Sequence, residues 1–377
     1  MIALLFVLTM QAATPDIVVS GKRLAEAYEA CVEQGCPPLR DAQVSIAFAE
    51  QQFRQGAYQK ARYTLAAAVA RNKDNAAVAP KPVAALYEAY ATVSLHDGEM
   101  DVFKKAVGGQ VRTLRDNLPP NDPAVTAAAF ATGDMWVSLG NGRAAESSYR
   151  AVERQALANG DATLTMLATL RRVSLAAARS DPAGAARLLA EAEARPAAAD
   201  PALRSVLQVV RLRLAAKRAD NGTVDRLVRD IGHETSARPI LVWSPPYEPT
   251  AQASAMEDAA KFGSANPVPA RSSDLVPIQW VDIGFWIKPD GKTDDAEILR
   301  GSRSTGWANY LVRQVSERRY TGVPSPNGGR GVYRIERFSL RGTYKAPIDS
   351  LINRRSVPAA LEVLDLTAPE TSVTASR

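Results

Sequence analysis

The stretch WVDIGFWIKPDGKTDDAEILR, residues 280–300, decides the fold of the C-terminal part of this chain. Its first half has the period-two pattern of a half-buried strand, in which Val281, Ile283, Phe285 and Ile287 alternate with Asp282, Gly284, Trp286 and Lys288. The pair Asp290-Gly291 then predicts a hairpin turn, because glycine takes the positive-φ position. On the return strand we expect Ala296 and Ile298 to point inward.

The residues after this hairpin predict a helix and one more strand. Trp307, Leu311 and Val315 recur at i, i+4 and i+8, which predicts a short helix over about 303–317 that covers one face of the sheet. The last strand is expected over 331–344. A phase change along it predicts a β-bulge between its two apolar pairs, which are Tyr333 with Ile335 and Phe338 with Leu340.

This order of elements resembles the C-terminal domain of TonB proteins. The resemblance covers residues 277–345 and rests on Trp280-Val-Asp-Ile-Gly-Phe, the Pro289-Asp-Gly turn, the strand end Ile298-Leu-Arg-Gly-Ser302 and the helix leading to Arg319-Tyr320. It implies a three-stranded antiparallel sheet with the helix on one face. The Tyr-Pro pair that usually precedes the first strand in that family is absent here.

The same resemblance implies a binding site. The last strand would be an exposed edge to which a partner's peptide adds as a further strand, with affinity from main-chain hydrogen bonds. The implied partner-binding strand consists of Val332, Tyr333, Arg334, Ile335, Glu336, Arg337 and Phe338. The side chains of Arg334, Glu336 and Arg337 would tune selectivity. The implied partner is a protein or peptide of the cell envelope, such as an outer-membrane receptor.

The N-terminal half predicts one helix after another, broken at regular intervals. The breaks fall at Gln55-Gly56, Asp97-Gly98, Leu139-Gly140, Ser180-Asp181-Pro182 and Asp220-Asn221-Gly222. The first three glycines are spaced 42 residues apart. A repeat of this length with a turn inside each unit is typical of an α-solenoid of helical hairpins.

The unit around Gly140 resembles the tetratricopeptide repeat. Gly140 would form the tight turn, Ala145 would allow the second helix to approach the first, and Tyr149 would fill the groove one turn later. Two other units repeat the pattern, as Gly56, Ala61 and Leu65 and as Ser180, Ala185 and Leu189. The second and fifth units depart from it, with Phe103 and Leu227 at the small position.

The sequence therefore predicts an α+β chain with an N-terminal α-solenoid of tetratricopeptide-like hairpins and a small C-terminal β-β-α-β domain. The helical-repeat domain is expected over 20–232 and a proline-rich linker over 233–276. The TonB-like domain follows over 277–345. The tail, 346–377, is expected to be mostly disordered, with a short helix around 359–364.

The N-terminus predicts export. Residues 2–10 are apolar and uncharged, too few to span a bilayer but suited to a signal peptide over 1–13, or to a truncated membrane anchor. Membrane contact is expected only in the second case. In an oxidising periplasm Cys31 and Cys36 would form a small disulfide loop, and two free buried thiols are the alternative. The expected location is periplasmic, with inner-membrane anchoring as the variant.

Composition and motifs point away from catalysis. The net charge is +6, and no nucleic-acid-binding signature accompanies it, so nucleic acid is not an expected partner. The sequence contains no His/Cys metal cluster, no phosphate-cradling glycine loop and no nucleophile elbow. We therefore expect a protein that is not an enzyme and holds no cofactor or metal.

Three functions fit these patterns. The first is a non-enzymatic periplasmic protein that binds an envelope partner by β-strand addition at the TonB-like domain, with the helical repeats as scaffold. The second is a tetratricopeptide-type adaptor for envelope assembly in which the C-terminal domain is only structural. The third is a TonB-type energy transducer for outer-membrane transport.

Overall fold

A computed structural model describes residues 21–216, 239–245, 278–302, 305–322, 329–345 and 355–367. The chain divides into two compact units, Met1–Val210 and Arg211–Arg377. The first is helical and the second contains the described strands, so the α+β class is confirmed. The expected signal peptide and the break at Asp220-Asn221-Gly222 lie outside the described residues.

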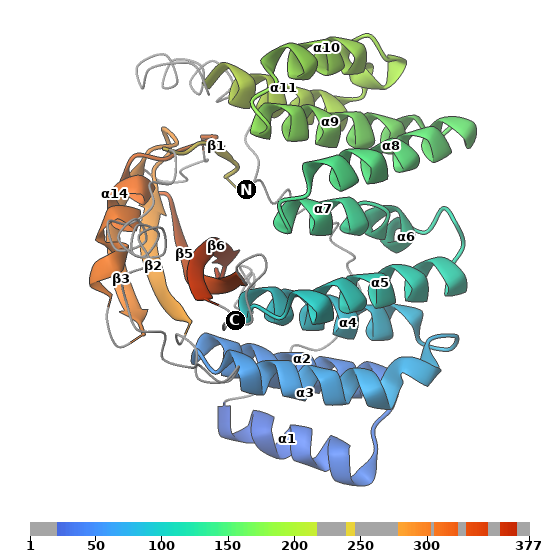
Figure 1. Cartoon of the computed structure of the whole chain (residues 1–377), viewed down its shortest axis with the longest axis vertical. Coiled ribbons are helices and arrows are strands. Elements are labelled where there is room, and N and C mark those ends of the chain that lie inside the picture. The colour runs from blue at the N-terminus through green and yellow to red at the C-terminus, as the bar shows by residue number, and fades with distance from the viewer. Residues whose placement is uncertain are drawn as a thin grey trace, which may run out of the picture. The chain divides into compact units, whose positions relative to one another are not determined.

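The helices of the first unit stack in chain order as antiparallel pairs (Figure 1). They are α1 (Gly21–Gln34), α2 (Pro38–Arg54), α3 (Tyr58–Asn72), α4 (Pro80–His96), α5 (Met100–Asn117), α6 (Pro123–Ala128), α7 (Ala131–Ser138), α8 (Gly142–Ala158), α9 (Ala162–Ala178), α10 (Pro182–Glu193) and α11 (Pro201–Ala216), the last of which runs across the boundary between the units. The pairs α2–α3, α4–α5, α7–α8 and α9–α10 are the hairpins that the sequence predicts.

Each of these hairpins turns with the same backbone geometry. The turning residue has a positive φ of 79° at Gly56, 81° at Gly98, 71° at Gly140 and 59° at Ser180. Two reversed hydrogen bonds close each helix end; at the third turn Gly140 N donates to Val137 O over 2.9 Å and Asn141 N to Trp136 O over 2.8 Å. This is the Schellman motif, in which the two hydrogen bonds satisfy carbonyl groups of the last helical turn. The predicted repeat is therefore present in the backbone itself.

The small residues of the repeat lie where the two helices of a hairpin meet. Ala61 and Ala145 are fully buried and Ala185 is 1% exposed. Tyr149 fills the space one turn later, where its ring lies against Gly133 of α7 so closely that a Cβ on Gly133 would be 2.2 Å from it. Phe103, the departure in the second unit, is also buried.

Ion pairs join one hairpin to the next. Arg62 of α3 donates to Asp97 over 2.6 Å, and Arg171 of α9 donates to Asp134 of α7 over 2.6 Å. The most buried contact of this kind joins Arg172 of α9 to Glu153 of α8, with both side chains 8% exposed. Since each buried charge has an opposite partner, the hairpins are fixed in register without stranded charges.

The second unit is built around a four-stranded antiparallel sheet with the order β3-β2-β5-β6. Its strands are β2 (Gln279–Ile287), β3 (Thr293–Gly301), β5 (Val332–Lys345) and β6 (Arg355–Asp365), and α14 (Asn309–Ser316) covers one face. The core holds the predicted inward residues of β2 together with Leu311, Val315 and Phe338. The predicted hairpin and helix are therefore both present.

Two further elements complete this unit. The short strand β1 (Leu241–Trp243) pairs antiparallel with β4 (Arg319–Tyr320). The proline-rich segment 233–276 thus contributes a strand and is not purely a linker. Thr321 fixes the pairing at its end, donating from its amide to Ile240 O over 2.9 Å.

The expectation for the tail is wrong where the structure describes it. Residues 355–365 form β6, neither disordered nor helical, and pair with β5 from Glu336↔Asp365 to Lys345↔Arg355. The reason is that β5 extends past β2 and offers a long row of backbone groups, which must find partners. Leu361 also packs against the core that α14 covers.

The predicted bulge in the last strand is also wrong. The register of β5 against β2 runs without a shift from Gln279↔Leu340 to Ile287↔Val332. The strict alternation therefore places Arg334 and Glu336 on the same face as Phe338, toward α14. The resemblance implies that Arg334 and Glu336 are available to a partner, whereas the register places both on the core side of the sheet.

We expect Gly140 and Ser180 to respond to substitution in opposite directions. The Gly140→Ala change should lower the free energy of unfolding by about 1 kcal/mol, because alanine resists positive φ. No atom lies within 4 Å of the added methyl group, so a clash is not the cause. The Ser180→Gly change should raise the free energy of unfolding by about 0.5 kcal/mol. Urea unfolding followed by circular dichroism measures both, and stabilisation by alanine at 140 would contradict the repeat geometry.

We also expect the Arg172–Glu153 pair to contribute far more to the free energy of unfolding than a surface ion pair does. The Arg172→Met change should cost about 3 kcal/mol, because it removes one partner of a buried ion pair. The matched control is Arg54→Met, which breaks the exposed Arg54–Glu50 pair of α2 and should cost less than about 0.5 kcal/mol. Equal losses in urea unfolding would show that the buried pair has no special weight.

Candidate functional site

The strand that the sequence analysis assigns to partner binding has no free edge over most of its length. β5 is hydrogen-bonded to β2 through Val332–Leu340 on one side and to β6 from Glu336 onward on the other. Beyond that pairing, Ile335 O accepts from Leu366 N over 2.8 Å, and Ile335 N donates to Thr367 Oγ1 over 3.1 Å. The prediction of an exposed edge is therefore wrong for residues 335–338, because β6 and the two residues after it occupy the place meant for a partner.

Arg334 and Glu336, expected to tune selectivity, belong to the core side of the sheet. Glu336 is 6% exposed and accepts from Arg318 Nη1 over 2.6 Å. Arg318 also donates to the Tyr320 hydroxyl over 3.2 Å. Burial, together with the Glu336 carboxylate, raises the pKa of Tyr320 to about 12. Arg334 lies over the Tyr320 ring. Both charged side chains therefore contact other residues of the same chain on the core side of the sheet.

Arg337 is buried on the opposite face. It has no exposed surface and binds Asp282 in a two-pronged ion pair, with Nε–Oδ1 at 2.6 Å and Nη2–Oδ2 at 2.9 Å. Arg300 donates to the same carboxylate over 2.7 Å, and the Trp280 ring stacks on the Arg337 guanidinium at 3.8 Å. Planar two-point contacts of this kind are strong and directional. Arg337 therefore fixes β5 to β2 and is not available to a partner.

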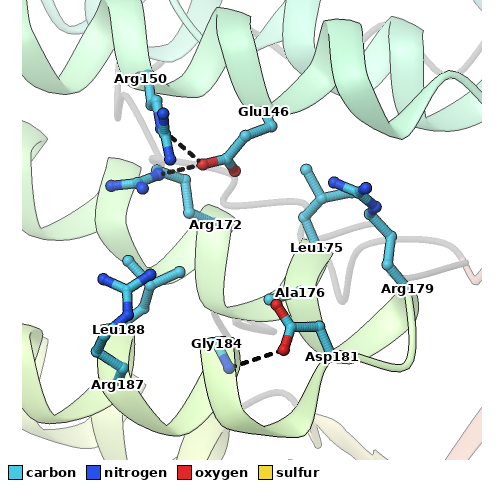
Figure 2. Close-up of a pocket in the computed structure, with 10 residues that line it drawn as sticks. All are labelled: Glu146, Arg150, Arg172, Leu175, Ala176, Arg179, Asp181, Gly184, Arg187 and Leu188. Carbon is cyan, nitrogen blue, oxygen red and sulfur yellow. Dashed lines mark hydrogen bonds and ion pairs between the residues drawn. The ribbon is translucent and has the colours of Figure 1, made fainter.

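A different site lies in the helical unit. A recess of about 220 Å³ lies between α8, α9 and α10. We call it the arginine recess, because its wall carries Arg150, Arg172, Arg179 and Arg187 together with Glu146 and Asp181. Figure 2 shows Arg150, Arg172 and Arg187 along one side, and Arg179 beside Asp181 along the other.

Helix geometry explains why these side chains converge. Arg150 follows Glu146 by one turn on α8, so both lie on one face. Arg172 comes from the neighbouring α9, and the turn after Ala178 carries Arg179 and Asp181 to the rim. Asp181 then begins α10 by accepting from Gly184 N over 2.8 Å. The hairpin register thus gathers residues that are far apart in sequence.

Both carboxylates of the recess are already engaged. Glu146 Oε1 accepts from Arg150 Nε and from Arg172 Nε, each over 2.9 Å. Arg172 reaches further in and donates from Nη1 to Glu153 Oε2 over 2.5 Å. Burial alone would lower the pKa of Arg172, but the adjacent Glu146 and Glu153 carboxylates raise it. Arg172 is therefore a fixed, permanently charged part of the wall.

Arg179 and Arg187 differ from the other two arginines. Both are exposed, and among the residues the structure describes neither has an ion-pair partner. Neither residue stands out in the sequence. Four arginines spread over 150–187 form no run in the sequence, and only the stacking of two hairpins brings them together. The sequence could have indicated this cluster only if the arginines had been placed on the predicted hairpins and the hairpins stacked in register.

The described residues offer little for other kinds of chemistry. They contain no group of three or more His, Cys, Asp or Glu side chains arranged to hold a metal ion. Among their helices, none is both long and apolar enough to cross a membrane. Cys31 and Cys36, which the sequence analysis pairs, are joined as a disulfide at the end of α1.

No known protein family matches the chain, and no curated protein matches it either. Several solved structures resemble it, among them the following two. BtubC (BKLC) from P. vanneervenii has 14% sequence identity and a TM-score of 0.39, over 68% of this chain and 94% of that one. A tetratricopeptide repeat protein from Parabacteroides merdae has 16% identity and a TM-score of 0.37, over 64% of this chain and 79% of that one. Similarity this low adds nothing to the hairpin geometry described above.

Proposed function

We propose that the chain is a non-enzymatic, exported scaffold of the cell envelope whose helical hairpins bind a protein partner. One contrast carries this proposal. From Ile335 to Phe338 the strand expected to receive a partner is hydrogen-bonded on both sides, whereas the helical unit presents an open recess with two exposed, unpaired arginines among its described residues. Stacked hairpins offer long surfaces that suit extended partners. In this proposal the C-terminal sheet is structural.

Export is supported by two independent observations. Residues 2–10 have the apolar character of a signal-peptide core. The Cys31–Cys36 disulfide at the end of α1 suits an oxidising compartment, since cytosolic thiols are kept reduced. An energy transducer of the TonB type would in addition need a membrane anchor, and the N-terminal residues that could provide one lie outside the described part.

Strand addition at the outer edge of β6 is the second candidate. Among the described strands, β6 pairs only with β5, and none pairs with its other side. Val363 of β6 is 42% exposed, and the backbone groups of an edge strand can pair with a further strand. A partner could therefore extend the sheet beyond β6, one strand further out than the sequence predicts.

Cross-linking in cells separates the two candidates. A photoreactive amino acid would replace one exposed residue at a time in the full chain: Tyr63 on α3, Leu157 on α8, Arg187 on α10 or Val363 on β6. We expect adducts with one and the same protein from at least two helical positions, identified by mass spectrometry. Adducts from position 363 alone would establish strand addition and contradict the scaffold proposal.

Thiol trapping tests the location. Cells expressing the full chain would be lysed in the presence of a maleimide-linked polymer, which labels free thiols and slows the protein on a gel. The experiment would be done with and without prior reduction. We expect no shift in gel mobility before reduction and a shift from two labelled thiols after it, in the periplasmic fraction. A Cys31→Ser, Cys36→Ser variant should show no shift in either condition. Labelling of the native chain without reduction would place it in a reducing compartment.

A further inference from the structure

The arginine recess has more positive charge than its own carboxylates neutralise. Four guanidinium groups face two carboxylates, a formal balance of +2. Glu146 is used twice, by Arg150 and by Arg172, and Asp181 holds the first turn of α10. The charge that remains belongs to Arg179 and Arg187 at the rim.

Part of this wall is rigid, which matters for binding. Arg172 is 8% exposed in its side chain and is held by Glu146 and Glu153. Glu153 itself accepts from Thr169 over 2.6 Å and from Arg195 over 3.0 Å. The inner side of the recess therefore keeps its shape, and a ligand has to order only Arg179 and Arg187. Fewer side chains to immobilise means a smaller entropic cost of binding.

The size of the recess limits the ligand. Its volume of about 220 Å³ is below the range of roughly 300–1,000 Å³ that is typical of pockets for whole small-molecule ligands. Leu175 and Leu188, both buried, form an apolar floor. This combination fits one or two side chains whose methylene groups cover the floor while their ends meet the arginines.

We propose that the arginine recess binds the side-chain carboxylates of an acidic segment in the protein partner. This inference rests on the proposed function and names the chemistry of that partner. Arginine's planar fork matches a carboxylate at two points, and Arg179 and Arg187 stand on different elements, so two acidic residues can be held at once.

A nucleic acid fits the recess less well. Backbone phosphates repeat along a strand and call for a continuous line of cations, whereas Glu146 and Asp181 lie between the arginines of this wall. The apolar floor also offers no aromatic ring on which a base could stack. Preferential binding of an oligonucleotide would therefore overturn the proposal.

The test uses the purified full chain and fluorescein-labelled hexaglutamate, with binding followed by anisotropy at two salt concentrations. The recess variant is Arg179→Gln with Arg187→Gln, since neither residue has a structural ion pair among the described residues. The control variant is Lys105→Gln with Arg112→Gln, two exposed residues of α5 that remove the same charge outside the recess. Hexaglutamine and a single-stranded oligonucleotide serve as further probes.

We expect hexaglutamate to bind, more weakly at the higher salt concentration, and hexaglutamine not to bind. The recess variant should lose affinity by about tenfold, as two charge-assisted contacts are removed, while the control should lose less than about twofold. Equal losses in both variants, no binding of hexaglutamate, or a preference for the oligonucleotide would each overturn the proposal. If cross-links to helical positions persist in such a case, the scaffold function stands and only the acidic partner is wrong.

Discussion

The helical unit depends on how closely the two helices of a hairpin approach. At that crossing the side chain is alanine in three hairpins, as at Ala61, Ala145 and Ala185, and each is almost completely buried. The approach is possible only because the preceding turn reverses the chain within a few residues through a positive φ. Once the crossing is fixed, the aromatic and aliphatic groups that fill the groove follow from the helical period.

The same register determines where charges meet. Arg62, Arg171 and Arg172 each reach from one hairpin to an acid of the neighbouring one. Buried pairs of this kind often add little net stability, but an altered register would leave each charge without a partner. They therefore act against wrong stackings of a repetitive sequence. In the arginine recess this pairing is incomplete among the described residues, because Arg179 and Arg187 have no acid of the neighbouring hairpin beside them.

Features set by local pattern were predictable from the sequence. The turns at Gly56, Gly98 and Gly140 and the alternating strand from Val281 to Ile287 needed only nearby residues. The strand β6 was missed because its alternation is short and Pro358 interrupts it, and its stability comes from the unpaired side of β5, which a local pattern does not reveal. A weak strand pattern in the sequence does not exclude a strand where a neighbouring strand supplies the backbone hydrogen bonds.

The charged residues of β5 were misplaced for a related reason. The selectivity role implied for Arg334 and Glu336 requires that they face a partner, and polar side chains usually mark the outer face of a strand. In the fold, Arg318 neutralises Glu336, and Arg334 lies over the Tyr320 ring with Asp365 as its acidic neighbour, so a charged side chain can face the core side of the sheet. The four arginines of the recess were missed because their meeting point is defined by two stacked hairpins and not by spacing in the chain.

The position of β6 has a consequence for shortened forms of the protein. A chain cut before Arg355 would keep the contacts among β2, α14 and the first half of β5, yet would expose a bare row of amides and carbonyls to solvent. We expect the shortened chain to self-associate through this edge, so that it loses solubility before it loses its fold. Proteolytic trimming at this point would thus replace the edge strand β6 with the unpaired side of the longer strand β5, which favours aggregation.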